Sequence, residues 1–287
     1  MIMSRRTTAT NGEECHNMPE LPEVENTRRN LIRFGLPGCT ITGSNITWAN
    51  TVKKPTATEL AQGLKNRTIQ DVQRKGKYLI LPLSGASPAA FIVHLGMTGR
   101  FLVQPQSQEA DPLTRHFFPL DDGRELRFVD GRKFGKLWLV DSPEEVLPVM
   151  SPEPFDEDFT VETLAESFSG KKAPVKALLL EQSIACGLGN LYVDESLFLA
   201  RIHPEKPGAE FSVDEIARLH QSIKDALSAA YGVYDRAREQ DWPNPPTALM
   251  TWSHPRDIKA PCPNCGTNMT AIRVRARGTY FCSKCQV

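Results

Sequence analysis

Met18-Pro-Glu-Leu-Pro-Glu-Val-Glu25 places two prolines and three carboxylates in eight residues, directly ahead of an apolar period. The second proline suits the first turn of a helix, which does not need the N–H that proline lacks. Apolar residues then recur at helical spacing: Leu21, Val24, Leu31 and Phe34. The stretch predicts a helix over residues 20–34 with Pro19, Glu20 and Glu23 held together at its start.

Pro19 is chemically distinctive if the chain starts at Met18. Removal of that methionine leaves the proline nitrogen as a free secondary amine, with a pKa of about 8. Such an amine can attack an electrophilic carbon and form an imine, and neighbouring carboxylates suit acid–base steps. If the chain starts at Met1, the same nitrogen is an amide and cannot react. The alternative without chemistry is a helix start alone.

Residues 1–17 are rich in Ser, Thr, Asn and Arg and show no periodicity. We expect a disordered extension or a misassigned start. An organelle transit peptide is an alternative, which Glu13 and Glu14 disfavour. No apolar core suggests a secretory signal, and no apolar run approaches the length that spans a membrane.

Charge is distributed unevenly along the 287 residues, although the formal net charge is zero and therefore creates no global attraction for nucleic acid. Residues 141–170 carry nine acidic side chains and no Lys or Arg, whereas residues 256–287 carry six basic side chains and one Asp. The length allows two domains, and the 40% hydrophobic content is that of a globular protein.

The pattern changes from β-rich to helical along the chain. Short β-rich runs punctuated by turn residues predict a sandwich or barrel: 68–72, 77–83, 90–95, 100–103, 125–129 and 136–140. An acidic, proline-containing linker is expected at 141–158. Helical patterns follow at 160–168, 174–182, 191–201 and 212–231. Residues 232–260 contain four prolines and predict a long loop.

Two C-x-x-C pairs near the C-terminus predict one structural zinc ion. Cys262–Cys265 and Cys282–Cys285 are separated by 16 residues, and each pair offers two thiolates from one turn. Four thiolates leave no open position for catalysis. A redox dithiol is the alternative. The other cysteines are scattered, which favours a reducing compartment over a disulfide framework.

Between the cysteine pairs lie three alternating arginines, Arg273, Arg275 and Arg277. Alternation predicts that they share one face of a strand or hairpin. The face is either a solvated basic edge or a phosphate-binding finger, since the Arg fork matches phosphate oxygens.

Three further glycine-containing segments are candidates for nucleic-acid contacts. Residues 94–99 and 130–135 follow apolar strands and offer Met97, Arg132 and Phe134. Proteins that extrude a base often fill the vacancy with such side chains. Gly187-Leu-Gly-Asn190 precedes a helix and suits an anion. Each segment alone is also consistent with an ordinary turn, as is Arg74-Lys-Gly-Lys77.

Taken together, these motifs resemble the formamidopyrimidine-DNA glycosylase family, which also contains the endonuclease VIII enzymes. The resemblance covers about residues 18–287 and rests on the motifs at 18–25, 74–79, 94–99, 130–135, 187–192 and 194–198 and on the cysteine module.

The resemblance implies an α+β multidomain fold. It comprises an N-terminal β-sandwich flanked by helices at 18–145, a helix–two-turn–helix domain at 146–235, a lesion-capping loop or linker at 236–260, and a four-cysteine zinc finger at 261–287. The expected partner is double-stranded DNA with oxidised bases or abasic sites, bound by a monomer in a bacterial cytoplasm or nucleoid, or in an organelle or nucleus.

The resemblance also implies roles for individual residues. Pro19 resembles the nucleophile, Glu20 the acid that protonates the sugar, and Glu23 a supporting carboxylate. Phosphate anchors around an everted nucleotide are implied at Lys77, Asn190 and Arg277, of which Lys77 and Arg277 also belong to the catalytic set. Side chains that enter the gap are implied at Met97, Arg132 and Phe134, with further DNA contacts from His94, Lys176 and Tyr192.

The implied activity is a bifunctional glycosylase and abasic-site lyase that removes oxidised purines and cuts the strand by β,δ-elimination. Two alternatives remain: preference for oxidised pyrimidines, and a non-catalytic lesion-binding protein if residues 1–17 are retained. A generic zinc-ribbon binding module is a less specific third. The sequence departs from the family pattern in three places: at the extension, at Gly131 in place of a usual proline, and at 232–260, where Trp252-Ser-His-Pro-Arg256 stands.

Overall fold

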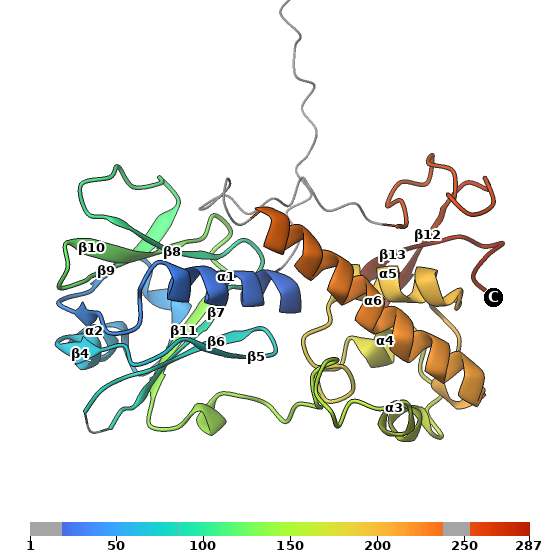
Figure 1. Cartoon of the computed structure of the whole chain (residues 1–287), viewed down its shortest axis with the longest axis horizontal. Coiled ribbons are helices and arrows are strands. Elements are labelled where there is room, and N and C mark those ends of the chain that lie inside the picture. Colours follow the sequence, from blue (N-terminus) through green and yellow to red (C-terminus); the bar gives the residue numbers. More distant parts are fainter. Residues whose placement is uncertain (1–18, 86, 238–252) are drawn as a thin grey trace, which may run out of the picture.

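Helix α1 (Leu21–Arg33) lies against a strand-rich half of the molecule, and a helical half with a C-terminal hairpin lies beside it (Figure 1). The computed structural model describes residues 19–85, 87–237 and 253–287. The predicted extension at 1–17 and most of the predicted capping loop at 236–260 fall outside the described residues. No helix in the described ranges is both long and apolar enough to cross a membrane.

The strand-rich half follows α1 with short strands and two helical interruptions. Its elements are β1 (Thr40–Ile41), β2 (Asn45–Ile46), η1 (Ala49–Thr51), β3 (Val52–Lys54), α2 (Ala57–Leu64), β4 (Arg67–Thr68), β5 (Gln73–Lys75), β6 (Tyr78–Pro82), β7 (Ala90–His94), β8 (Arg100–Pro105), β9 (Thr114–Pro119), β10 (Arg124–Val129) and β11 (Lys136–Val140).

A connecting segment over residues 141–158, which contains η2 (Pro143–Glu145), leads to the helical half, and this half ends in the hairpin. The elements of the helical half are α3 (Val161–Phe168), α4 (Val175–Leu179), α5 (Asn190–Ala200), η3 (Gly208–Glu210), α6 (Val213–Ala237), β12 (Thr270–Val274) and β13 (Arg277–Phe281).

Two sheets form the sandwich, with strand orders β2-β9-β10-β8 and β3-β11-β7-β6-β5. Phe91 of β7 meets Phe101 and Phe118 of the facing sheet edge to face, with ring centroids 6.2 and 5.4 Å apart. Val24 and Leu31 of α1 join the same fully buried core. Burial alternates along β9, because successive side chains of a strand point to opposite faces. Every second residue of β9 therefore packs between the two sheets.

Most predicted elements agree with the structure within a residue or two, and the differences have physical causes. The predicted strand at 68–72 is wrong, because pairing stops at Thr68 and resumes at Gln73. The helix predicted at 212–231 continues to Ala237, since Tyr234 packs inward at 2% exposure. Residues 232–237 of the predicted loop are therefore helical. Helix α2 lies among the strands, where no helix was predicted.

A buried ion network joins the two halves. Arg74 pairs with Glu25 of α1 and with Glu153 of the connecting segment, at 3.0 and 2.7 Å, and its side chain is only 11% exposed. Arg29 reaches α6, where it pairs with Asp235 at 3.1 Å. The acidic segment predicted as a linker thus also supplies a fixed structural contact, and Arg74 does not lie in a solvated turn.

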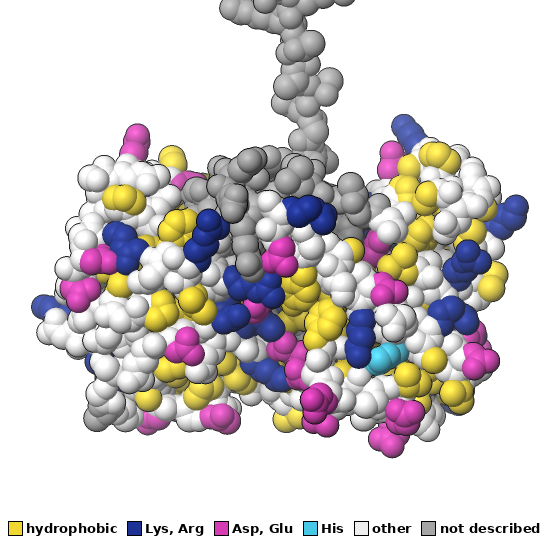
Figure 2. All heavy atoms as spheres, in the orientation of Figure 1, with side chains coloured by type: hydrophobic (Ala, Val, Ile, Leu, Met, Phe, Trp, Pro, Cys, Tyr) yellow, Lys and Arg dark blue, Asp and Glu magenta, His cyan; other side chains and the backbone are white. Residues whose placement is uncertain are grey.

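The network lines an open cleft of about 810 Å³ between α1 and α6. Arg and Lys side chains gather on the surface where the two halves meet (Figure 2). The guanidinium groups of Arg28, Arg29 and Arg74 are bonded to the Glu25 carboxylate. Partial burial raises the pKa of Glu25, but these bonds outweigh it and lower the pKa to about 2. The cleft contains none of Pro19, Glu20 and Glu23.

Replacing Arg74 with Met should lower the free energy of unfolding by about 3–5 kcal/mol, because the buried Glu153 would lose its guanidinium partner, whereas Glu25 keeps Arg28 and Arg29. Chemical denaturation measures the change. Lys54→Met is the matched control, since Lys54 and Glu145 form an exposed pair between the same two segments of chain. Equal losses in both variants would contradict the assignment.

Candidate active site

The start of α1 faces the start of α5 through one side chain, Glu20. Its carboxylate accepts hydrogen bonds from the backbone N–H groups of Gly189 and Leu191, at 2.6 and 2.9 Å, and from that of Tyr192 at 3.4 Å. The predicted anion site at Gly187–Asn190 therefore exists, and its anion is a side chain of the same protein.

Two glycines make this approach possible. A Cβ at Gly189 would lie 2.5 Å from the Glu20 carboxyl carbon. Gly187 has a φ of +86°, and a Cβ there would lie 2.7 Å from Leu21. The Gly187 carbonyl also accepts the Leu21 N–H at 3.0 Å. The two helix starts can therefore meet only where side chains are absent.

Glu20 is 1% exposed, and burial raises its pKa to about 7. The nearby Lys77 ammonium and the α5 backbone N–H groups work in the opposite direction, and the charge of Glu23 adds to the rise. A carboxyl group with this pKa holds a proton for a substantial part of the time near neutral pH. It can therefore donate that proton to a bound molecule.

Glu23 is held by three donors. Its carboxylate accepts the Glu20 N–H at 2.8 Å, the Tyr192 hydroxyl at 2.8 Å and the Tyr234 hydroxyl at 2.9 Å. Burial nevertheless raises the pKa of Glu23 above its ordinary value. Pro19, half-buried, immediately precedes this pair of carboxylates.

Lys77, Asn190 and Arg277 converge on the same region from three elements. The Lys77 ammonium donates to the Leu188 carbonyl at 2.8 Å. Its pKa is lowered, first by burial and also by the positive charge of Arg277, whereas Glu20 and Glu23 raise it. Asn190 donates to the Gly278 carbonyl at 3.2 Å, which places the β12–β13 hairpin beside the start of α5.

Lys176 and Tyr192, which the resemblance assigns to DNA contacts, both have fully buried side chains in this structure. Lys176 pairs with Asp194 of α5 at 2.6 Å and donates to the Gly278 carbonyl at 3.1 Å. Tyr192 is directed at Glu23. Both residues therefore hold the surrounding site together from within.

The three predicted gap-entering side chains lie on two adjacent turns, 95–99 and 130–135. Phe134 is 51% exposed, and the Arg132 guanidinium lies 5.3 Å from its ring centroid. Met97 is half-buried on the other turn. His94, where that turn begins, accepts the Gly96 N–H at 3.1 Å through Nδ1. Burial lowers the pKa of His94 to about 4, so the ring stays neutral.

The expectation that Arg273, Arg275 and Arg277 share one face is wrong. Arg275 and Ala276 both have positive φ and form the tight turn of the hairpin. Arg277 is registered opposite Val274 and Arg273 opposite Gly278. Because opposite residues in an antiparallel pair share a face, Arg277 shares the face of the buried Val274, although its own side chain is exposed, and Arg273 lies on the other face.

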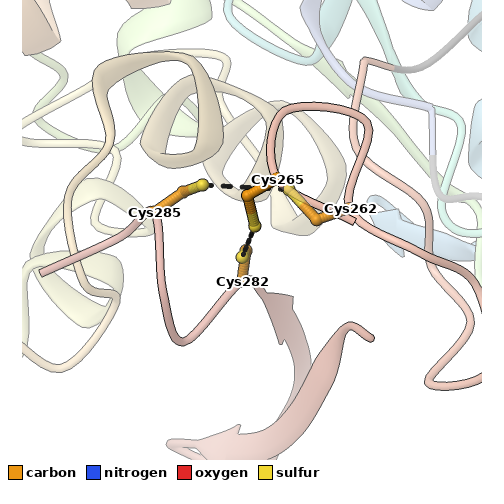
Figure 3. Close-up of side chains that lie close together, drawn as sticks. All are labelled: Cys262, Cys265, Cys282 and Cys285. Carbon is orange, nitrogen blue, oxygen red and sulfur yellow. Dashed lines mark hydrogen bonds between the residues drawn. The ribbon is translucent and has the colours of Figure 1, made fainter. Parts of the chain in front are cut away.

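The four cysteines form a closed metal site (Figure 3). All four sulfur atoms lie within 4.8 Å of one another, with Cys262–Cys285 at 4.0 Å and Cys265–Cys282 at 3.5 Å. Tetrahedral zinc–thiolate geometry requires sulfur separations of about 3.8 Å. The donor set and the spacing both fit one structural zinc ion, which would be held by all four thiolates.

Several residues take structural roles around the site that the sequence did not predict. Tyr234 is 211 residues from Glu23, its hydrogen-bond partner. Glu195, within a quoted motif, accepts the Ser253 N–H at 2.8 Å and contacts His254 Nδ1 at 3.1 Å. Arg256 pairs with Asp194 at 2.9 Å. The described end of the divergent segment is thus anchored on α5.

Replacing Cys282 with Ser should abolish zinc binding and weaken DNA binding, because β13, which carries Arg277 and Gly278, ends at this site. Elemental analysis and a DNA titration measure the two effects. We expect one zinc per chain in the parent protein. Cys39→Ser is the control, since Cys39 lies in the core of the sandwich. Zinc retention by the Cys282 variant would contradict the ligand assignment.

Three family models together match most of the chain. Residues 18–137 match the formamidopyrimidine-DNA glycosylase N-terminal domain, residues 150–237 the formamidopyrimidine-DNA glycosylase H2TH domain, and residues 260–287 the zinc finger found in FPG and IleRS. The four cysteines are therefore the ligands of a structural zinc ion of this known type.

Individual proteins agree with these matches. A formamidopyrimidine-DNA glycosylase of Cytobacillus firmus is 37% identical, over 94% of this chain and 100% of that protein. One of Chloroflexus aurantiacus is 39% identical, over 94% and 98%.

Solved structures agree as well. The Lactococcus lactis enzyme, bound to DNA containing an abasic site, superposes with a TM-score of 0.80 at 32% identity, over 93% and 99% of the two chains. MutM in complex with DNA containing carbocyclic 8-oxo-G superposes with a TM-score of 0.82 at 31% identity, over 94% and 100%. The chain therefore belongs to the formamidopyrimidine-DNA glycosylase family.

Proposed function

We propose that this protein is a DNA glycosylase of base excision repair with abasic-site lyase activity, and that it removes oxidised purines. The single observation that carries the proposal is the buried Glu20 carboxyl group beside Pro19, which is protonated near neutral pH and held by the start of α5. The relatives are formamidopyrimidine-DNA glycosylases, and solved relatives hold DNA with 8-oxo-G, Fapy-dG or an abasic site.

In the proposed reaction, the free nitrogen of Pro19 attacks C1′ of the damaged nucleotide. The N–C1′ bond forms as the bond from C1′ to the base breaks, and the departing base takes the proton that the amine releases. Glu20 then protonates O4′ as the C1′–O4′ bond breaks, which leaves an iminium ion between the nitrogen and C1′.

The iminium ion makes the C2′ proton acidic. Loss of that proton expels the 3′ phosphate, and a second elimination expels the 5′ phosphate. Glu23 keeps Glu20 in position through the Glu20 backbone N–H. Lys77, Asn190 and Arg277 are proposed to bind the phosphates around the everted nucleotide, because they surround the carboxylates from three different elements.

Met97, Arg132 and Phe134 are proposed to occupy the gap that the everted nucleotide leaves in the duplex, with His94 at the base of the first turn. An apolar side chain, an aromatic ring and a guanidinium lie together on adjacent turns. That combination suits an unstacked step in duplex DNA. The zinc ion supplies no chemistry here; it holds the hairpin that presents Arg277.

Preference for oxidised pyrimidines remains the nearest alternative, because the residues that would cap the base fall largely outside the described ranges. A domain division at 18–145, 146–235, 236–260 and 261–287 also remains our proposal. Since the relatives are bacterial, we propose that the protein acts on the nucleoid in a bacterial cytoplasm.

Borohydride trapping on an 8-oxoguanine duplex tests the nucleophile. We expect a covalent adduct with a chain that starts at Pro19 after removal of Met18, and none with a chain that retains residues 1–17, because an amide nitrogen cannot form an imine. Adducts with both chains would require processing or another nucleophile. No adduct with either, on this or a thymine glycol duplex, would favour the lesion-binding alternative.

The rate of base excision should depend on pH through two groups. Glu20 must be protonated, so the rate falls as pH rises through its pKa of about 7. Pro19 must be unprotonated, so the rate falls as pH drops below about 8. The profile of kcat/KM is therefore a bell with its maximum at about pH 7.5.

Glu20→Gln should lose the alkaline limb of this profile together with most of the activity. Single-turnover excision across pH measures both. Cys39→Ser is the control and should keep the full bell, since Cys39 lies in the core of the sandwich. A parent profile that rises continuously to pH 9 would exclude Glu20 as the proton donor.

A further inference from the structure

The two turns that carry Met97, Arg132 and Phe134 are joined by one buried side chain that has no role in the proposed reaction. We propose that Asp130 and Thr98, together called the turn latch, are positioning residues that hold the gap-filling side chains in one register. This inference rests on the proposed function and assigns a role to residues that touch neither the lesion nor the nucleophile.

Asp130 is fully buried, and each of its carboxylate oxygens accepts a hydrogen bond from a different part of the pair of turns. Oδ1 accepts the Thr98 hydroxyl at 2.7 Å. Oδ2 accepts the Gly135 N–H at 2.8 Å. The first bond crosses between the turns, and the second closes the turn that contains Arg132 and Phe134.

Arg132 is tied to both members of the latch through its backbone. Its N–H lies 3.2 Å from Asp130 Oδ1 and 3.2 Å from the Thr98 hydroxyl oxygen. The start of the Arg132 side chain is therefore positioned by the residue that follows Met97. If turn 95–99 moves relative to turn 130–135, these shared hydrogen bonds must break.

The backbone of the two turns is in direct contact beneath the latch. Gly96 has a φ of +71°, and a Cβ there would lie 2.5 Å from the Phe134 carbonyl carbon and 2.6 Å from the Gly135 nitrogen. A Cβ at Gly135 would lie 2.3 Å from the Phe128 ring. The turns are packed against each other and against the sandwich core, so they move as one unit.

The main chain of Asp130 extends the connection to β9. Its N–H donates to the Leu113 carbonyl at 3.0 Å, and its carbonyl accepts Arg115 Nε at 2.9 Å. The latch is thus anchored to the sheet, whereas Phe134 projects into solvent. Because the backbone of the two turns is already fixed and the side chains are exposed, little further ordering of the turns is needed when those side chains enter a stacked duplex.

Hydrogen bonds to a buried carboxylate are strong because the charge is removed from water. Loss of the cross-turn bond should therefore misplace Met97 relative to Arg132 and Phe134. Misplacement of these side chains should affect the reaction only in duplex DNA, where the everted nucleotide leaves a gap opposite the other strand. Reactions on an abasic site in single-stranded DNA should not depend on the latch.

The test is Thr98→Val, which removes the hydroxyl at nearly constant volume, with Thr98→Ser as the matched variant that restores it. We expect Thr98→Val to lower single-turnover excision from an 8-oxoguanine duplex about tenfold. Thr98→Ser should recover most of the loss. Strand cleavage at an abasic site in single-stranded DNA should change less than about twofold in either variant.

A second measurement separates the latch from the chemistry. A 2-aminopurine placed opposite a tetrahydrofuran site, which cannot react, reports unstacking of the opposite base when the gap is filled. Thr98→Val and Asp130→Asn should both reduce the fluorescence rise at saturating protein. This readout remains informative if the protein proves to bind lesions without cleaving them.

The double variant Met97→Ala/Thr98→Val decides whether Thr98 acts through its neighbour. We expect a combined loss clearly smaller than the product of the single losses, because both changes remove the same placement. The proposal is overturned by multiplicative losses, by an unchanged duplex rate in Thr98→Val, or by equal losses on duplex and single-stranded substrates.

Discussion

The Glu20 carboxylate at the start of α5 is the contact on which the rest of the site depends. It is the point where a helix of the sandwich half meets a helix of the other half, and 169 residues separate Glu20 from Gly189. The N–H groups of a helix start stabilise the charged form of a carboxylate, whereas burial stabilises the protonated form. Because burial is the larger effect here, the pKa of Glu20 is about 7, and its charged and protonated forms are both populated at neutral pH.

Two groups of buried, paired charges hold the elements around the Glu20 contact in place. Arg74 joins Glu25 to Glu153 on one side of α1. Lys176, Asp194 and Arg256 form a second group beneath the zinc hairpin. Each charge has a partner of opposite sign, and both groups oppose relative movement of the elements that they join. The site is thereby preorganised by residues that never approach a substrate.

A chain with zero net charge can still bind a polyanion when its cations are placed locally. Lys77, Asn190 and Arg277 come from the sandwich, from α5 and from the zinc hairpin. No one of these elements provides the site alone. The zinc ion matters for the same reason as Glu20: it fixes a short element that is too small to hold its own geometry.

The sequence by itself determined the parts of this protein whose signal is local. Cysteine spacing predicted the zinc site, the proline- and glutamate-rich start predicted α1, and six ordered motifs indicated the family and most of the site residues. Local spacing succeeds where one turn or one helix presents the group. It failed for Arg273, Arg275 and Arg277, because a two-residue turn at Arg275–Ala276 reverses the chain and divides the arginines between two faces.

Only the tertiary structure decided which polar residues face a ligand and which hold others in place. The family resemblance implies DNA contacts for Lys176 and Tyr192, yet both are buried and bonded to carboxylates. Tyr234 gave no signal, and the bond between Asp130 and Thr98 could not be predicted from their two motifs, because the partners lie 211 and 32 residues apart. The physical reason is that burial and charge compensation depend on distant segments, which meet only when the two halves pack together.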